Sequence, residues 1–217
     1  MTESEDDREI LARDVLPRSH PAERPMGMPA LSPSTYWTAE MVRALLDDGN
    51  RYECIDGELL VTPSPGNPHQ FVVGAFYRAI FPYFAETGLG LVLTSPLDVE
   101  LDDGMIVQPD TFAFRDSAAA AKGRIHGSDL LLVAEVISKS TAGRDRTIKR
   151  EFYARIGVYE YWIVDQAARR VERWRAGATA AELESGTLTW QPPGATRPLL
   201  IDLPALFDAI PEGYRTP

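Results

Sequence analysis

The sequence predicts a mixed α/β fold in which one β-sheet is flanked by helices. Residues 130–137 form an apolar run rich in branched side chains, which is typical of a strand buried on both faces of a sheet. Residues 69–85 carry apolar side chains at helical spacing, which predicts a long helix packed on that sheet. A helical pattern at residues 143–155 separates the buried strand from a second strand at residues 159–164, so we expect these two strands to be parallel.

Local signals place the other elements along the chain. Thr38 is a predicted N-cap, at which the first helix begins. Asp56-Gly57 lies between two strand-like segments and predicts a hairpin, because these residues accommodate the positive φ angles of a tight turn. Further strands are expected at residues 89–93, 97–101, 106–114, 169–175 and 199–201, and a short helix at residues 204–210.

Length and composition fit one domain with tails. The chain has 217 residues, of which 44% are hydrophobic, and this is enough for a core. Residues 1–33 hold acidic residues, several prolines and few large apolar side chains, so we expect a disordered or loosely attached arm there. The domain is predicted at residues 34–210, with a short tail at residues 211–217.

The charge of the chain limits its partners. The formal net charge is −10, which argues against nonspecific coating of nucleic acid, because such binding requires clustered basic residues that neutralise phosphates. One local basic cluster follows the buried strand and fits either a nucleic-acid contact or an ordinary solvated helix face. Its members are Arg144, Arg146, Lys149, Arg150 and Arg155.

Several classes of protein are disfavoured by missing patterns. Cys54 is the only cysteine, so neither an intrachain disulfide nor a thiolate metal cluster is expected. Neither a signal peptide nor an apolar run long enough for a membrane span is evident, and we expect a soluble, cytoplasmic protein. Without a glycine-rich phosphate loop, no nucleotide cofactor is indicated.

Glu135 is the first candidate for a functional residue, because it lies inside the buried strand. Burying an unpaired carboxylate is costly, so such a residue usually has a metal, a cation or a substrate as its partner. If the strand at residues 106–114 is its neighbour, Asp110 can face Glu135 at the same level. Opposed carboxylates repel unless a cation lies between them, and Mg²⁺ or Mn²⁺ suits such oxygen ligands.

Short segments occur along the chain in a characteristic order and spacing: Tyr52–Leu59, Pro63–Pro65 with His69-Gln70, Val107–Asp110, Ala134–Ser138 and pieces between Ser140 and Asp165. In these segments the chain resembles the Uma-type family of restriction-endonuclease-like proteins, a branch of the PD-(D/E)xK nuclease superfamily. The resemblance covers residues 36–208. It implies a restriction-endonuclease-like mixed β-sheet flanked by helices.

One position departs from the superfamily pattern. The third residue of the (D/E)xK tripeptide should be lysine, and here it is Ile137. In this branch the lysine lies on the following helix, where Lys149 matches it. Asp145, Lys149 and Tyr153 are spaced at i, i+4 and i+8, so they share one edge of a helix. Lys139 is the alternative, in a predicted loop.

The resemblance implies a Mg²⁺-dependent (or Mn²⁺-dependent) endonuclease that hydrolyses DNA phosphodiester bonds with water as the nucleophile. Asp110 and Glu135 would hold the metal, and Lys149 would orient the water or stabilise the phosphorus centre. Glu53 is the preferred supporting ligand, with Glu58 as a competitor. Three auxiliary residues are implied with them: Gln108, His69 and Tyr153.

Each assignment also has an ordinary interpretation. The ordinary interpretation of Glu135 is a buried carboxylate satisfied by Lys149 or Arg144, and that of His69 is a histidine at the beginning of a helix. For the whole protein, one alternative is a catalytically inactive nuclease fold that binds DNA or another protein, and a second is a nuclease for RNA. A homodimer would bring one site to each strand of a DNA duplex, although no residue in the sequence requires dimerisation.

Overall fold

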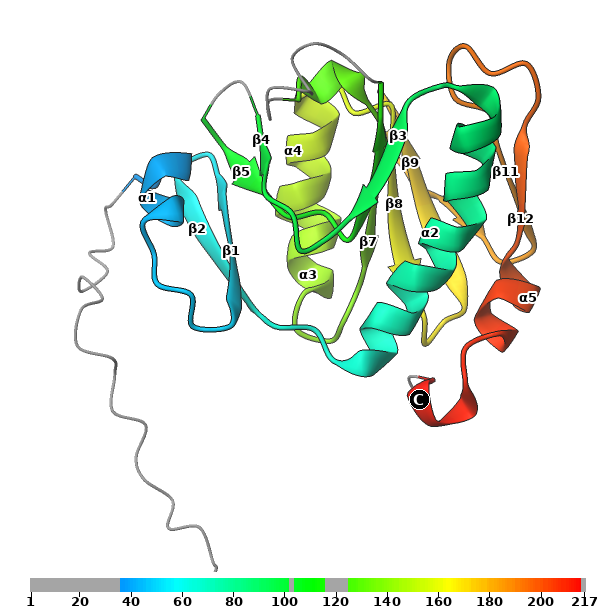
Figure 1. Ribbon diagram of the computed structural model, residues 1–217, viewed down its shortest axis with the longest axis horizontal. Coiled ribbons are helices and arrows are strands. Elements are labelled where there is room, and N and C mark those ends of the chain that lie inside the picture. The colour runs from blue at the N-terminus through cyan, green and yellow to red at the C-terminus, as the bar shows by residue number, and fades with distance from the viewer. Residues whose placement is uncertain (1–35, 102–103, 116–124, 216–217) are drawn as a thin grey trace, which may run out of the picture. The chain divides into compact units, whose positions relative to one another are not determined.

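A six-stranded sheet occupies the centre of the part of the chain that is described, residues 36–101, 104–115 and 125–215 of a computed structural model. The predicted arm at residues 1–33 lies outside these ranges. β7 and β8 are parallel, as predicted, and the other neighbours are antiparallel (Figure 1). Across the sheet the strands are β10 (Glu182–Glu184), β9 (Arg170–Arg175), β8 (Glu160–Asp165), β7 (Leu130–Val136), β6 (Thr111–Phe114) and β3 (Leu91–Thr94).

A second sheet begins with the predicted hairpin. β1 (Asn50–Ile55) and β2 (Glu58–Pro63) pair in antiparallel fashion, and the turn residues Asp56 and Gly57 have φ angles of 52° and 78°. Thr38 caps α1 (Ala39–Arg43) by accepting a hydrogen bond from the Met41 amide. The sheet continues through β5 (Ile106–Val107) to β4 (Val99–Glu100).

The prediction of a single strand at residues 106–114 is wrong, because the chain leaves one sheet and enters the other within this segment. β5 ends at Val107 and β6 begins at Thr111. Pro109 lies between them, and proline lacks the N–H group that a strand needs for its ladder. Asp110 therefore lies at the junction of the two sheets.

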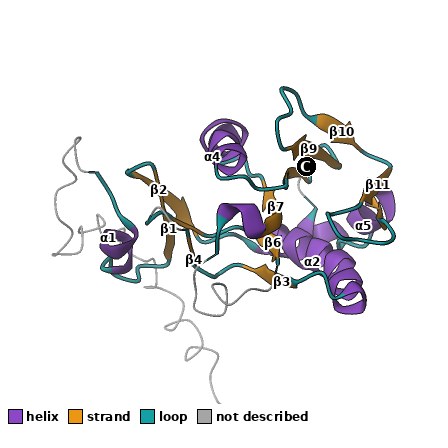
Figure 2. Ribbon diagram, turned by 90° about the horizontal axis from the view of Figure 1, so that it is seen from above, coloured by secondary structure: helices purple, strands orange, loops and turns teal. Residues whose placement is uncertain are grey.

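Helices cover both faces of the central sheet. Figure 2 shows α2 (Asn67–Thr87) and α4 (Arg150–Arg155) on opposite sides of β6 and β7. α2 packs on the face that also contacts α5 (Leu203–Asp208) and the hairpin of β11 (Thr187–Trp190) and β12 (Leu199–Asp202). Tyr153 of α4 packs with Val133 of β7 on the other face. Short 3-10 helices lie at Gly127–Asp129 and Glu212–Tyr214.

The helix predicted at residues 143–155 differs from expectation in its interior. α3 (Ala142–Arg144) passes into a π-helical turn, Asp145–Lys149, before α4 begins. Single π-turns inside helices are rare and often occur at functional sites. In this turn Asp145 and Lys149 are both buried.

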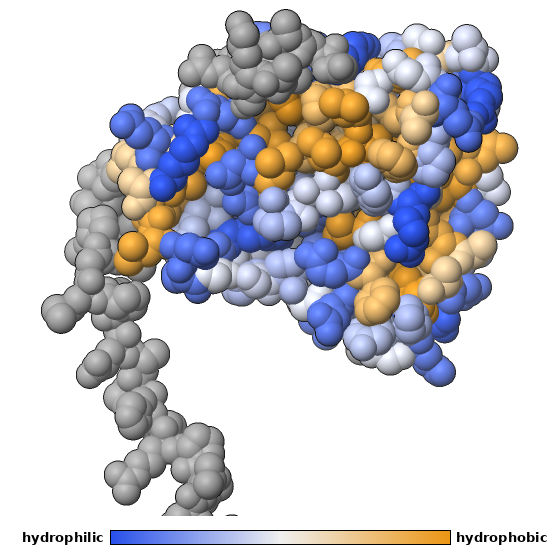
Figure 3. Space-filling model, in the orientation of Figure 1, coloured by the Kyte–Doolittle hydropathy of each residue, from blue (hydrophilic) through white to orange (hydrophobic). Residues whose placement is uncertain are grey.

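The edge strand β3 presents exposed apolar residues. Leu91 and Leu93 are exposed, while Val92 between them is buried. Figure 3 shows apolar side chains gathered over this part of the molecule. Within the described ranges, none of the helices combines the length and apolar composition that crossing a membrane requires.

Trp190 attaches the β11–β12 hairpin to the main core. Its buried ring stacks on Phe84 of α2, with ring centroids 5.8 Å apart, and meets Trp162 of β8 edge-on at 5.3 Å. Aromatic pairs of this kind add stability beyond the area they bury. Neither β11 nor β10 was predicted from the sequence, because both strands are short and lie among glycine-rich and polar residues.

We expect Trp190→Ala to lower the free energy of unfolding by about 3–5 kcal/mol, because it leaves a large cavity between α2 and the sheet. Urea denaturation of the two proteins measures the difference. Leu200→Ala is the matched control, since Leu200 lies on β12 and is 62% exposed; its effect should stay within about 0.5 kcal/mol. Equal midpoints for the two variants would contradict the packing described.

Candidate active site

Four buried carboxylates meet where the two sheets and the π-turn come together. Glu53 comes from β1, Asp110 from the residue before β6, Glu135 from β7 and Asp145 from the π-turn. Each residue is at most 4% exposed. β6 and β7 are neighbours with Thr111 opposite Ala134, so the predicted adjacency of Asp110 and Glu135 is confirmed.

Lys149 is the cation at the centre of this carboxylate cluster. Its Nζ lies 2.8 Å from Glu53 Oε2 and 2.9 Å from Glu135 Oε1, and the residue is 5% exposed. Two of the three ammonium hydrogens can be directed at these oxygens. The third hydrogen remains available for another oxygen at the cluster.

Asp110 is held by three donors from three elements. Its Oδ1 accepts from Arg51 Nη1 at 2.8 Å, and its Oδ2 accepts from the Val136 amide at 2.9 Å. His69 Nε2 lies 2.9 Å from the same Oδ2. Burial would raise the pKa of Asp110, but the hydrogen bond and charge of His69, together with Arg51, lower it to about 2. Asp110 is therefore ionised at neutral pH.

The pKa of Glu135 is shifted in the opposite direction. Burial raises its pKa to about 8, against the opposing charge of Lys149, and Asp110 and Glu53 add to the increase. For Lys149, burial acts to lower the pKa, but Glu135 and Glu53 raise it above its ordinary value. Lys149 is thus protonated, whereas Glu135 holds a proton at neutral pH that a metal ion at this residue would displace.

The predicted auxiliary residues join the cluster unequally. The Tyr153 hydroxyl lies 3.2 Å from Glu135 Oε1, so Tyr153 holds Glu135 rather than Lys149. Gln108 contributes its backbone amide, which donates to Glu53 Oε1 at 2.9 Å, while its side chain donates to Asp98. Of the two candidates for the supporting carboxylate, Glu53 lies in the cluster, whereas Glu58 is exposed on β2.

Lys139, the alternative to Lys149, lies on the surface. It is exposed in the segment between β7 and α3. Lys149 instead reaches the carboxylates from the helix above β7. The structure thus places the helical lysine in the cluster and leaves Lys139 outside it.

Arg51 and Asp145 belong to the cluster but were not among the predicted site residues. Arg51 lies two residues before Glu53 on β1, and residues at i and i+2 share one face of a strand. That alternation could have revealed Arg51 once Glu53 was chosen. Asp145 shares a helix edge with Lys149 in the sequence, but its burial depends on the packing of the π-turn against the sheet.

The basic cluster expected after the buried strand does not form one cationic surface. Lys149 points inward, and Arg144 donates to the Val61 carbonyl and the Thr62 hydroxyl. The other arginines pair with separate acidic residues or rings. The outward-facing arginines thus have separate partners, and a nucleic-acid contact by these residues stays a prediction.

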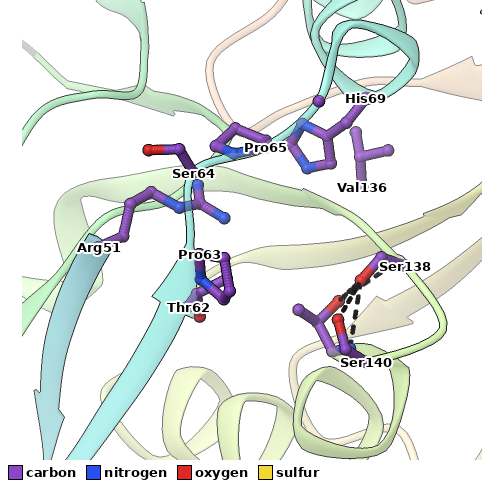
Figure 4. A pocket seen from close by; sticks show the side chains of 11 residues that line it. Arg51, Thr62, Pro63, Ser64, Pro65, His69, Val136, Ser138 and Ser140 are labelled. Carbon is purple, nitrogen blue, oxygen red and sulfur yellow. Dashed lines mark hydrogen bonds between the residues drawn. The ribbon is translucent and has the colours of Figure 1, made fainter. Parts of the chain in front are cut away.

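A pocket opens beside the carboxylate cluster (Figure 4). Its cavity volume is about 220 Å³, which is smaller than the roughly 300–1,000 Å³ of sites for drug-sized molecules. The pocket is lined by Arg51, residues 62–66, His69, Val136, Ser138, Ser140 and Thr141. Arg51 and His69 therefore lie between the pocket and Asp110.

The oxygen atoms of the carboxylate cluster are suitable ligands for a hard divalent cation. Asp110, Glu135 and Glu53 offer carboxylate oxygens, the ligands that Mg²⁺ and Mn²⁺ prefer. In the described residues, no three His, Cys, Asp or Glu side chains are already arranged around a common point for a metal. A metal at these residues would therefore require Lys149 or Arg51 to shift from the carboxylates that they now neutralise.

Comparison with known proteins agrees with the resemblance found in the sequence. The profile of the Uma2 family, described as "Putative restriction endonuclease", matches residues 39–203. A search of curated proteins found no match. Among solved structures, the chain is similar to a "putative nuclease belonging to DUF820" from Anabaena variabilis ATCC 29413, with a TM-score of 0.63 and 17% identity over 79% of this chain and 98% of that chain.

These findings confirm the predicted fold class and family. At 17% identity the solved structure shows a common fold, which is a mixed α/β architecture with sheets flanked by helices. The family match spans most of the chain and includes Glu53, Asp110, Glu135 and Lys149. The chain therefore belongs to the Uma2 family.

Proposed function

We propose that this protein is a Mg²⁺-dependent endonuclease that hydrolyses DNA phosphodiester bonds at the carboxylate cluster. The observation that carries this proposal is the position of Lys149, whose ammonium group lies 2.8 Å from Glu53 and 2.9 Å from Glu135, on the strand paired with the one that follows Asp110. Buried carboxylates with an adjacent ammonium group can hold a metal and stabilise charge on a phosphoryl oxygen. Membership of a family described as restriction endonucleases supports the same reaction.

Asp110, Glu135 and Glu53 would hold the metal. When bound, Mg²⁺ or Mn²⁺ lowers the pKa of a water molecule and neutralises charge on the phosphoryl group. The remaining contributions come from the chain itself. Lys149 donates to the attacking water or to a phosphoryl oxygen, and Tyr153 holds Glu135 in place.

The residues around Asp110 fix its position. Arg51, His69 and the Val136 amide fix both of its oxygens. A carboxylate held from several sides loses little rotational freedom on binding a ligand. The nucleophile is water, so the reaction forms no covalent enzyme intermediate: the water oxygen bonds to phosphorus as the bond to the leaving sugar oxygen breaks.

A catalytically inactive nuclease fold is the second candidate. Lys149 already pairs with Glu53 and Glu135, and Arg51 with Asp110. Carboxylates that are neutralised by the chain itself are also what a purely structural cluster requires. In that case the protein would bind nucleic acid or another protein without cleaving it.

We expect the purified protein to cleave plasmid DNA in Mg²⁺ or Mn²⁺ and to lose cleavage in chelator. Glu135→Gln and Lys149→Ala should each lower the rate by about a hundredfold or more, because each removes a group at the reacting centre. Glu151→Gln is the matched control, since its side chain is 72% exposed and its rate should be unchanged. Gel electrophoresis of plasmid, single-stranded DNA and RNA substrates measures the rates.

The outcomes separate the candidates. If DNA is cleaved and both site variants abolish the cleavage, the proposed endonuclease is supported. If RNA is cleaved in preference to DNA, the same site acts on RNA instead. Cleavage that survives Glu135→Gln points to a contaminant and contradicts the site. If no substrate is cut but DNA is bound, the inactive binding module is favoured.

A second prediction tests metal binding without activity. Lys149→Met should lower stability by about 3–5 kcal/mol, because it leaves buried carboxylates without their cation. Saturating Mg²⁺ should then raise the melting temperature more in this variant than in the unchanged protein, since a ligand of the native state stabilises it. Differential scanning calorimetry with and without Mg²⁺ measures both effects.

Glu135→Gln is the control for that experiment. It removes a metal ligand, so its melting temperature should respond least to Mg²⁺. Equal Mg²⁺ responses in the unchanged protein and both variants would mean that the cation acts elsewhere. That result would count against the metal site even if cleavage were observed.

A further inference from the structure

The pocket beside the cluster is free of acidic residues in a strongly acidic chain. The chain has 32 Asp and Glu residues and a formal net charge of −10, yet no carboxylate lines the pocket in the described residues. Its charged lining residue is Arg51, accompanied by His69 and by the hydroxyl groups of serine and threonine. A recess of this composition favours an anion.

Arg51 has donors that the protein leaves unused. Its guanidinium group offers five N–H donors, of which Nη1 binds Asp110 at 2.8 Å. Arg51 Nε is buried without a hydrogen-bond partner in the described structure, and so is His69 Nδ1. Buried polar atoms without a partner are uncommon, and both of these belong to residues that line the same pocket.

The opposite wall can also donate. Ser138 Oγ lies 3.0 Å from Ser140 Oγ and 3.2 Å from Thr141 Oγ1, and Figure 4 shows Ser138 and Ser140 across the pocket from Arg51. Hydroxyl hydrogens rotate to suit a ligand. On the side of Pro65 and His69, Gly66 precedes the long helix α2 and lines the pocket, and the N-terminus of such a helix favours a negative charge.

We propose that this pocket binds one backbone phosphate of the nucleic acid, adjacent to the phosphate that is cut, with Arg51 as its principal donor. Arg51 then connects two groups: Nη1 holds Asp110 of the cluster, and the remaining N–H groups hold the phosphate. This inference rests on the proposed function for the location of the cut phosphate. It adds a substrate-binding residue that fixes the position of the strand relative to the carboxylates.

The test replaces one phosphate at a time by an uncharged methylphosphonate along a short single-stranded DNA. Binding is measured by fluorescence anisotropy, with the unchanged protein in chelator and with Glu135→Gln in Mg²⁺. Replacement at a single position beside the cut should weaken binding about tenfold, the effect of losing one charge-assisted hydrogen bond. Replacement elsewhere should have a small effect.

The variant Arg51→Lys tests whether the sensitive phosphate binds in the pocket. Lysine keeps a positive charge for Asp110 but offers no planar fork that can bind a second group at the same time. We expect this variant to lose about tenfold in binding to the unmodified strand and to show no further loss at the sensitive phosphate. Arg78→Lys, on the exposed surface of α2, is the matched control and should retain both properties.

The result that overturns the proposal is distinct from failure of the proposed function. A uniform effect along the strand, no binding to the strand, or a sensitive phosphate that persists in Arg51→Lys each overturns the phosphate site, even if DNA is cleaved. One sensitive phosphate that depends on Arg51 supports it, even if no cleavage is found. If Arg51→Lys unfolds, the position-by-position measurement on the unchanged chain still decides between one site and a uniform effect.

Discussion

Buried carboxylates gathered around one ammonium group are the feature on which the rest of this structure depends. Glu53, Asp110, Glu135 and Asp145 come from four separate segments, and mutual repulsion would drive these segments apart without Lys149. The cluster therefore couples β1, the β5–β6 junction, β7 and the π-turn.

The same constraint explains how an acidic chain can offer a site for a polyanion. Arginines after β7 are paired individually: partly buried Arg146 pairs with buried Glu172, and exposed Arg155 pairs with Asp56. Arg51 differs because it lies between a buried carboxylate and an open pocket without acids. Under the proposed function, attraction for phosphate would therefore be local to the pocket, which would favour binding in one position.

Sequence patterns were sufficient for features with a strong local signal. Glu135 stands out because an apolar strand contains a carboxylate, and the hairpin follows from Asp56-Gly57. The family resemblance, rather than periodicity, selected Lys149. Patterns failed where tertiary structure decides: the break at Pro109 divides one apolar run between two sheets, and the pairing of β11 with β12 depends on Trp190 packing against α2.

The position of the lysine on a helix has a consequence for the stability of the site. Ile137 occupies the tripeptide position, where its amide donates to the Val164 carbonyl and its side chain packs against the hydrophobic core that contains Tyr153. A lysine on the strand would be fixed by the sheet itself, whereas Lys149 is fixed by how the helix packs on the sheet. That packing includes the rings of Tyr153 and Tyr161, 5.0 Å apart, and the hydrogen bond from the Tyr161 hydroxyl to the Asp145 carbonyl.

The π-turn is part of the same arrangement. Its wider backbone brings both Asp145 and Lys149 to the buried side while Phe152 and Tyr153 of α4 remain in the core. The aromatic contacts beneath the helix are therefore as important to the cluster as the charged groups within it. Because the lysine and its carboxylates belong to different layers, the geometry of the site is determined by the interface between helix and sheet.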